Sequence, residues 1–182
     1  MSMRKLFVAA GVAGLALGVT AALAAGVALA ESPKLGKPIT QADLAEWDIT
    51  IFPDGTNLPP GSGKAADGAK IFAEKCVACH GENGQGGVAA RVIGGPPKAT
   101  LDGGKTIANY WPYATTVFDF IRRSMPWTQP RSLTDQEVYA LTAYILAANK
   151  LIGQDDEMNA TTLPKVKMPN RDNFVIRFPD RI

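Results

Sequence analysis

The chain has 182 residues, of which 46% are hydrophobic and 20% charged, values that are ordinary for one globular domain with additional segments. Two of its 19 Lys and Arg residues lie among the first 30 residues, so the other 17 balance the 17 Asp and Glu residues that follow. A chain that is neutral beyond residue 30 lacks the concentrated basic patch that nucleic-acid binding requires. We therefore exclude nucleic acid as a partner. The length also leaves little room for a two-domain enzyme.

The first 30 residues have the pattern of an export signal. Arg4 and Lys5 precede an uncharged run, residues 6–30, that is rich in Ala and Gly. This run ends in Ala28-Leu29-Ala30, which fits a signal peptidase site and predicts a signal peptide over residues 1–30. The alternative is a retained anchor, because the uncharged run is long enough to span a bilayer. A membrane is a partner only in that second case, and either reading places the rest of the chain in the periplasm.

The segment that follows the leader predicts an irregular arm and then a helix. Residues 31–63 are rich in Pro and Gly and form the expected N-terminal arm, with one short helix near residues 41–47. Residues 64–80 show helical spacing, and the face it brings together holds Gly68, Ile71, Phe72 and Cys76.

The middle of the chain predicts a loop and a second helix. Residues 81–112 carry many Gly and Pro residues without strand-like alternation, so we expect a loop there and no sheet. Thr115 or Thr116 is the expected cap of a helix that ends at Arg123, where Asp119 and Arg123 form a pair four residues apart.

The last helix is the clearest prediction. Thr134 and Glu137 form a capping box, and an apolar stripe follows until Lys150. Residues 154–182 are a polar, proline-bearing tail with few apolar anchors. The predicted fold class is all-α, with one helical domain over residues 64–153 between irregular N- and C-terminal extensions.

The chemistry lies in Cys76-Val77-Ala78-Cys79-His80, a C-x-x-C-H motif. This motif attaches a c-type haem, because two thiols add to the two vinyl groups and the adjacent His faces the iron. Zinc would need four ligands, but the chain has two Cys and one His in total. A thioredoxin-like redox pair would need a βαβ setting, and a plain disulfide would leave His80 without a role. We therefore predict one covalent haem c, with His80 as an iron ligand.

The second axial ligand has to come from another residue type, since there is no second His. Beyond the leader the methionines are Met125, Met158 and Met168. Met125 precedes Pro126, which favours an extended backbone that presents the thioether from a loop. We predict Met125 as the second iron ligand, with an open sixth site as the alternative; packing is the commoner role of any Met.

Other residues are candidates for orienting the haem. A backbone carbonyl in the turn at residues 94–97, which contains Pro96, is the expected acceptor for the His80 Nδ1 proton. Arg91, Trp111 and Tyr113 are candidate partners of the haem propionates, because Arg pairs with carboxylates and Trp N–H donates. Each of these three also has a simpler role, as a pocket wall or a solvated side chain.

The order of these features resembles class I cytochromes c, in which Gly68 and Phe72 would cross Tyr144 on the last helix. Seven further runs are similar to the cytochrome subunit of sulfane and sulfite dehydrogenases (SoxD type): Trp47-Asp48-Ile49, Pro53-Asp54-Gly55, Leu58-Pro59-Pro60-Gly61-Ser62-Gly63, Tyr110-Trp111-Pro112-Tyr113-Ala114-Thr115-Thr116, Ile121-Arg122-Arg123-Ser124-Met125-Pro126, Leu133-Thr134-Asp135 and Met168-Pro169-Asn170-Arg171-Asp172.

This resemblance implies an electron-transfer subunit that is not a catalyst by itself. Its partner would be a molybdopterin-containing sulfite or sulfane dehydrogenase subunit, and a downstream cytochrome or oxidase would receive the electrons. Many SoxD-type subunits carry a second haem domain that this sequence lacks, so sulfite and sulfane substrates both stay open. A free-standing periplasmic electron shuttle is the main alternative. A peroxidase-like or ligand-sensing haem protein would need an open iron site, against which Met125 argues. We expect both arms to pack partly on the haem domain and partly on the partner.

Overall fold

The computed structural model describes residues 35–45, 47–95 and 104–175. The chain divides into two units, Met1–Trp47 and Asp48–Ile182. In the described part of the first unit, α2 (Gln41–Ala45) is a short helix whose start is capped by reciprocal bonds between Thr40 and Asp43. The predicted leader, residues 1–30, lies outside the described residues. None of the helices in the described ranges has the length and apolar character needed to cross a membrane.

The first predicted helix of the second unit is present but divided. Helix α3 (Ala65–Lys75) ends just before Cys76, and α4 (Val77–His80) continues after it. Helix α3 packs on α7 (Asp135–Ala148), where Gly68 lies against the backbone carbonyl of Ala140. A side chain at position 68 would collide with that carbonyl, so glycine is required for the close crossing.

Helices α5 (Ile107–Tyr110) and α6 (Ala114–Ser124) lie between α4 and α7 in the sequence. The sequence prediction missed α5, which is a single turn capped by Thr106. The predicted start of α6 was late, because its first turn begins after Tyr113 without a side-chain cap rather than at a threonine cap. The predicted ion pair is confirmed, with Arg123 Nε and Asp119 Oδ1 separated by 2.8 Å.

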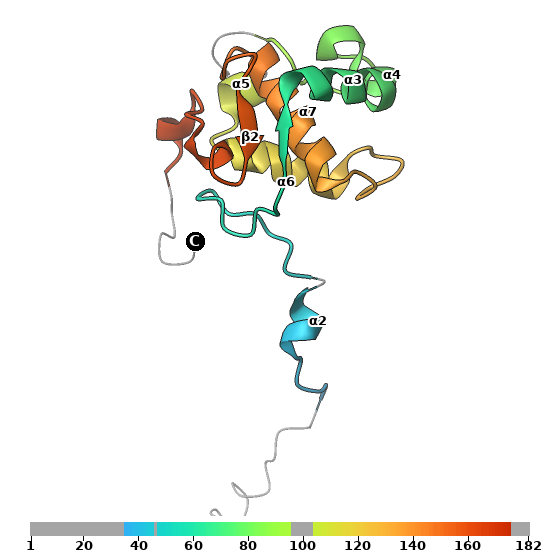
Figure 1. Ribbon diagram of the computed structural model, residues 1–182, viewed down its shortest axis with the longest axis vertical. Coiled ribbons are helices and arrows are strands. Elements are labelled where there is room, and N and C mark those ends of the chain that lie inside the picture. Colours follow the sequence, from blue (N-terminus) through green and yellow to red (C-terminus); the bar gives the residue numbers. More distant parts are fainter. Residues whose placement is uncertain (1–34, 46, 96–103, 176–182) are drawn as a thin grey trace, which may run out of the picture. The chain divides into compact units, whose positions relative to one another are not determined.

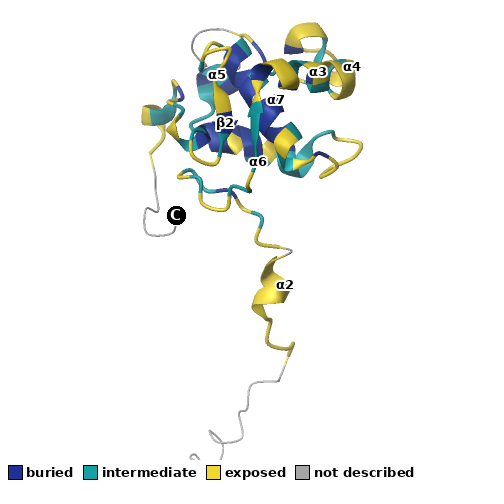
Figure 2. Ribbon diagram, in the orientation of Figure 1, coloured by how far each residue is buried: buried dark blue, intermediate teal, exposed yellow. Residues whose placement is uncertain are grey.

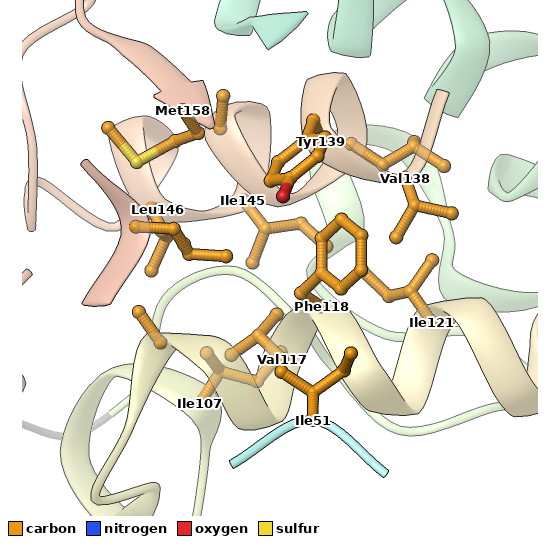
Figure 3. Packing of buried hydrophobic residues seen from close by; sticks show 14 of the residues in the cluster. Ile51, Ile107, Val117, Phe118, Ile121, Val138, Tyr139, Ile145, Leu146 and Met158 are labelled. Carbon is orange, nitrogen blue, oxygen red and sulfur yellow. The ribbon is translucent and has the colours of Figure 1, made fainter. Parts of the chain in front are cut away.

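Helix α7 forms the centre of the core (Figure 1). Its predicted capping box between Thr134 and Glu137 is confirmed, and the helix ends at Ala148, slightly before the predicted Lys150. The ring of Tyr139 packs on Phe118 of α6 with ring centroids 4.4 Å apart (Figure 3). Burial is concentrated where α6 and α7 meet (Figure 2).

A two-stranded sheet joins the two predicted arms. Strand β1 (Ser62–Lys64) pairs antiparallel with β2 (Glu157–Asn159), and both strands pack on α7. Each strand has only three residues, too few to show alternation in the sequence. The all-α fold class is confirmed with this small addition.

The C-terminal segment differs from its prediction as a polar tail. Met158, Leu163 and Met168 are all buried in the core cluster, and Ile51 of the N-terminal arm joins them. Leu58 and Val166 of the arms also pack against this cluster, whereas Leu35, Ile39, Trp47 and Val175 are exposed. The described parts of both arms beyond Trp47 therefore contribute to the haem domain's own core, whereas packing on a partner stays a prediction.

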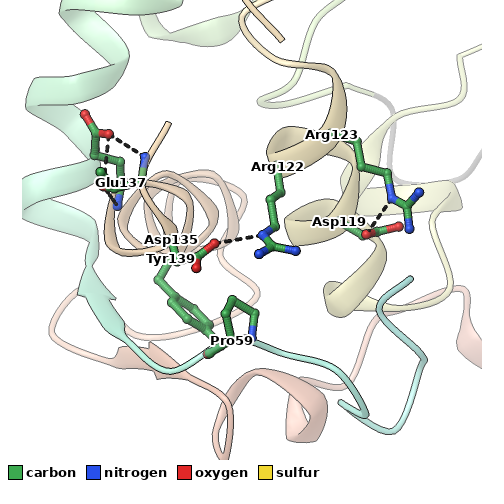
Figure 4. A network of polar contacts seen from close by, with 8 residues as sticks. Pro59, Asp119, Arg122, Arg123, Asp135, Glu137 and Tyr139 are labelled. Atoms are coloured by element: carbon green, nitrogen blue, oxygen red, sulfur yellow. Dashed lines mark hydrogen bonds and ion pairs between the residues drawn. The ribbon is translucent and has the colours of Figure 1, made fainter. Parts of the chain in front are cut away.

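Polar contacts connect the N-terminal arm and α6 to α7 (Figure 4). The hydroxyl of Tyr139 donates to the backbone carbonyl of Pro59 at 2.9 Å. Arg122 Nε of α6 lies 2.7 Å from Asp135 Oδ1 at the start of α7. These bonds fix the arm and the two helices against one another.

Candidate haem-binding site

The C-x-x-C-H motif forms one tight helical turn. The amides of Cys79 and His80 both donate to the carbonyl of Cys76, at 3.1 and 2.9 Å. Three-residue spacing on a helical turn places both cysteines on one side, and both are free thiols that line one cavity together with His80.

This cavity has a volume of about 560 Å³. Pockets that hold organic cofactors cover about 300–1,000 Å³, so the space suits a large cofactor. Its walls are mostly apolar side chains, contributed by α3, α5, α6, α7 and the loops between them. They include Phe72, Val92, Ile107, Val117, Phe120, Ile121, Leu133, Leu141 and Ile145. An apolar pocket with two adjacent thiols and one imidazole is what a covalently attached haem requires.

The ring of His80 is oriented by a backbone carbonyl, but a different one from that predicted. Nδ1 of His80 lies 2.7 Å from the carbonyl oxygen of Ala90. Since a carbonyl can only accept, Nδ1 carries the proton, and the Nε2 lone pair is left for a metal. The predicted acceptor turn at residues 94–97 is thus not the partner, and Pro96 itself lies outside the described residues.

The reason for this difference is the path of the loop after α4. Gly81 has φ of +76°, a value that favours glycine and ends the helix directly after the histidine. The chain then returns, so that the amide of Gly86 donates to the His80 carbonyl and that of Ala89 to the Cys79 carbonyl. This return brings Ala90 to the imidazole.

Met125 follows α6 and lines the same cavity as His80. Its backbone is extended, with φ of −115° and ψ of 144°, as the following proline predicted. Met158 and Met168 are only 4% and 1% exposed, belong to the core cluster and are not among the cavity-lining residues. The three methionines therefore divide into one at the cavity and two in the core, although ligation by Met125 stays a prediction.

The propionate candidates divide in the same way. Arg91 and Trp111 line the cavity, whereas Tyr113 is not among the lining residues. Its ring instead carries the guanidinium of Arg171, with Cζ 4.4 Å from the ring centroid. Tyr113 thus contacts Arg171 beside the wall, and its role as a propionate partner stays a prediction.

Sequence reasoning missed two further lining cations, Lys75 and Lys105. Single lysines in a helix or a glycine loop carry no sequence signal for such a role. Among the described lining residues there is no Asp or Glu, so the fixed charges of the cavity are all positive. Two haem propionates would meet favourable charge there. Lys75 also forms an ion pair outside the cavity lining, with its Nζ 2.6 Å from Glu137 Oε1.

The thiols are not arranged as a thiolate metal centre. Burial raises the pKa of Cys76 to about 11, an effect that the neighbouring Lys75 only partly opposes. An unattached Cys76 therefore keeps its proton at neutral pH. The described residues also contain no cluster of three or more His, Cys, Asp and Glu side chains able to hold a metal ion.

Exposed apolar side chains border the cavity. Val88 and Trp127 are 90% and 78% exposed, and both are among the lining residues. Bound haem supplies reversible one-electron chemistry. The protein's part is to hold the imidazole of His80 and to exclude water with its apolar walls.

A helical domain with this motif and this cavity defines a class I c-type cytochrome. Residues 65–149 match the family model of cytochrome c. A chain in the crystal structure of the sulfane dehydrogenase SoxCD from Paracoccus pantotrophus is 34% identical, with a TM-score of 0.72, and the match covers 82% of this chain and 75% of that chain. The chain belongs to the cytochrome c family and, within it, to the SoxD type that the sequence motifs indicated. It binds c-type haem covalently and transfers electrons.

Two further relatives are thiosulfate dehydrogenases. That of Stutzerimonas stutzeri (strain A1501) is 33% identical over 112 residues, which cover 54% of this chain and 35% of the relative. That of Psychrobacter arcticus is 35% identical over 83 residues, covering 43% of this chain and 24% of the relative. The chain thus matches about a third or less of the length of these two relatives.

Proposed function

We propose that this chain is the electron-accepting subunit of a periplasmic, molybdenum-containing sulfite or sulfane dehydrogenase. The observation that carries the proposal is the extent of the SoxCD match. It covers 82% of the chain, whereas the cytochrome c family model covers only residues 65–149. The similarity to a dehydrogenase chain therefore extends beyond the part that matches cytochromes c in general and includes much of the two arms.

The electron count defines the role. Oxidation of sulfite to sulfate, with water supplying the oxygen atom, releases two electrons and two protons, and that reaction would take place on the molybdenum subunit. A single haem accepts one electron at a time, so each sulfite would reduce this chain twice, and each sulfane sulfur more often. Between the two events the electron would pass to a downstream cytochrome or oxidase. Export is part of the proposal and is supported by the leader pattern at residues 1–30.

The apolar rim of the cavity suits the contact with such a partner. Trp127 is a large side chain that is 78% exposed beside the haem cavity. Exposed aromatic side chains are common anchors at protein interfaces. We assign Trp127 to the surface that meets the molybdenum subunit.

The test uses the full chain, affinity-tagged and purified from its native host. Molybdenum per haem is measured by elemental analysis, and haem reduction by sulfite and by a sulfane donor is followed in a stopped-flow spectrometer. We expect about one molybdenum per haem and reduction by at least one donor. A haem protein that contains no molybdenum and is reduced by neither donor would overturn the proposal and favour the free-standing shuttle.

A matched pair of variants examines the rim. Trp127→Ala is expected to slow reduction by the sulfur donor about tenfold, the effect of one lost interface anchor of about 1.4 kcal/mol. Trp127→Phe keeps an apolar aromatic surface and is expected to retain most of the rate. Reduction by dithionite, which needs no partner, should be the same in all three proteins.

A further inference from the structure

The turn at residues 110–113 forms part of the cavity wall. Trp111 lines the cavity and packs edge-on against Phe120 of α6, with ring centroids 5.6 Å apart and planes at 85°. The two tyrosines that flank it in the turn, Tyr110 and Tyr113, are both contacted by residues near the C-terminus. We call residues 168–174 the C-terminal clamp.

The first contact of the clamp is a hydrogen bond to the backbone of the turn. Asn170 Nδ2 donates to the carbonyl oxygen of Tyr110 at 2.7 Å. That carbonyl lies at the C-terminal end of α5, where backbone acceptors have no partner within the helix. The Oδ1 of Asn170 accepts from Asn173 Nδ2 at 2.9 Å, which fixes the orientation of the amide.

Two ring contacts complete the clamp. The guanidinium of Arg171 lies over the ring of Tyr113, 4.4 Å from its centroid. The ring of Phe174 packs on that of Tyr110 with centroids 5.5 Å apart at 69°. The same Tyr110 ring lies 5.0 Å from Nζ of Lys105, a cation that lines the haem cavity. The clamp is therefore connected to two cavity residues, Trp111 through the backbone and Lys105 through the Tyr110 ring.

The clamp is itself fixed to the core. Met168 at its start is 1% exposed, and the amide of Arg171 donates to the Met168 carbonyl at 3.1 Å. Asn170 and Arg171 do not line the cavity, so they touch the cofactor's surroundings only through the turn.

We propose that Asn170 and Arg171 are positioning residues that set the reduction potential of the haem by holding Trp111 in the cavity wall. Loss of either contact frees the turn at residues 110–113. When the indole of Trp111 then moves out of the cavity wall, water reaches the haem. Solvent exposure and lost second-layer contacts tune a haem potential, and a wetter site stabilises the more highly charged ferric state. Release of the clamp therefore lowers the potential.

The test is redox titration of the purified full-length holoprotein without any partner, so its outcome does not depend on the proposed molybdenum subunit. Asn170→Ala removes the hydrogen bond without changing charge, and Arg171→Ala removes the cation over Tyr113. We expect both variants to have a lower midpoint potential than the unchanged protein. Arg171→Lys keeps a cation above the ring, so its midpoint potential should lie close to that of the unchanged protein.

Lys167→Ala is the matched control, because it removes one positive charge from an exposed position directly before the clamp. If Arg171→Ala shifts the potential no more than Lys167→Ala, and Asn170→Ala does not shift it, the proposal is overturned. Thermal unfolding is recorded for every variant. Variants that lose stability but keep the potential would show a merely structural strap and would equally overturn the proposal. If one alanine variant does not fold, Arg171→Lys and the other alanine variant still decide.

Discussion

The two walls of the haem cavity are held in different ways. The wall that carries Cys76, Cys79 and His80 is closed by two hydrogen bonds with the adjoining loop. The amide of Ala89 donates to the Cys79 carbonyl, and the imidazole of His80 donates to the Ala90 carbonyl. The hydrogen bonds that hold this wall all lie within residues 76–90. Its geometry follows from one helical turn and one glycine.

The opposite case is the wall built from Trp111, α6 and Met125. Its supports come from both ends of the chain: Asn170 bonds the turn before Trp111, and Arg123 Nη2 donates to Thr50 Oγ1 at 3.2 Å. The arms are therefore structural supports of the methionine side of the site. Attachment of the haem is therefore a local property of the chain, whereas the environment of the haem depends on long-range packing.

The largest expected effect is on the local wall. Cys76→Ser or Cys79→Ser leaves at most one thioether, and we expect the yield of stable holoprotein to fall almost to zero, since the haem fills much of the core. Acid–acetone extraction and the pyridine haemochrome spectrum measure this. Extractable haem in the unchanged protein would contradict covalent attachment.

The next comparison separates the methionines. Met125→Ala should abolish the weak sulfur-to-iron absorption band of the ferric protein and lower the reduction potential. Met168→Ala should keep the band but cost about 2–5 kcal/mol of unfolding free energy, because its buried side chain leaves a cavity. Absorption spectra and denaturant unfolding measure the two outcomes. Loss of the band in Met168→Ala alone would show that the ligand assignment is wrong.

Gly68→Ala tests the helix crossing beneath the local wall. The added methyl group meets the Ala140 carbonyl, a backbone atom that cannot move without separating α3 from α7. We expect a loss of about 3 kcal/mol in denaturant unfolding. Ala66→Ser on the exposed side of α3 is the control and should change stability by less than about 0.5 kcal/mol.

Tyr139→Phe tests whether a hydrogen bond holds the N-terminal arm to α7. The variant keeps the buried ring but loses the hydrogen bond to Pro59, for an expected cost of about 1 kcal/mol. Tyr144→Phe keeps the ring contact with Phe72, at 5.2 Å between centroids, and should cost less. Equal losses in thermal unfolding would mean that the arm is not held by this bond.

The smallest expected effect depends on pH. The hydrogen bond from Lys75, followed by that from the Thr134 backbone, lowers the pKa of Glu137 in the folded state. Its contribution to stability is therefore full above the pKa of a free glutamate, about 4.3, and is lost as the pH falls through the lower folded value. Glu137→Gln keeps the capping geometry and should flatten the acid limb of the stability curve, below the pKa of a free glutamate. An unchanged acid limb would contradict this assignment.

Much of the site was predictable because its signals are local. The C-x-x-C-H motif, the capping box at Thr134 and the extended backbone before Pro126 each depend on a few consecutive residues. The contact between Gly68 and the last helix came from the family resemblance. The sequence did not identify Ala90 as the hydrogen-bond acceptor of His80, or Lys105 as a cavity residue. Both roles depend on how a loop folds back.

By itself, the sequence determined the cofactor and its attachment, because covalent chemistry needs only a fixed spacing of two thiols and an imidazole. It also determined the helical fold class, because the apolar residues of α7 recur at regular helical spacing. Only the tertiary structure decided that Met168 is a core residue and that Tyr113 and Arg171 face each other. Such contacts join residues far apart in the chain, where burial and close packing select partners that no short-range pattern records.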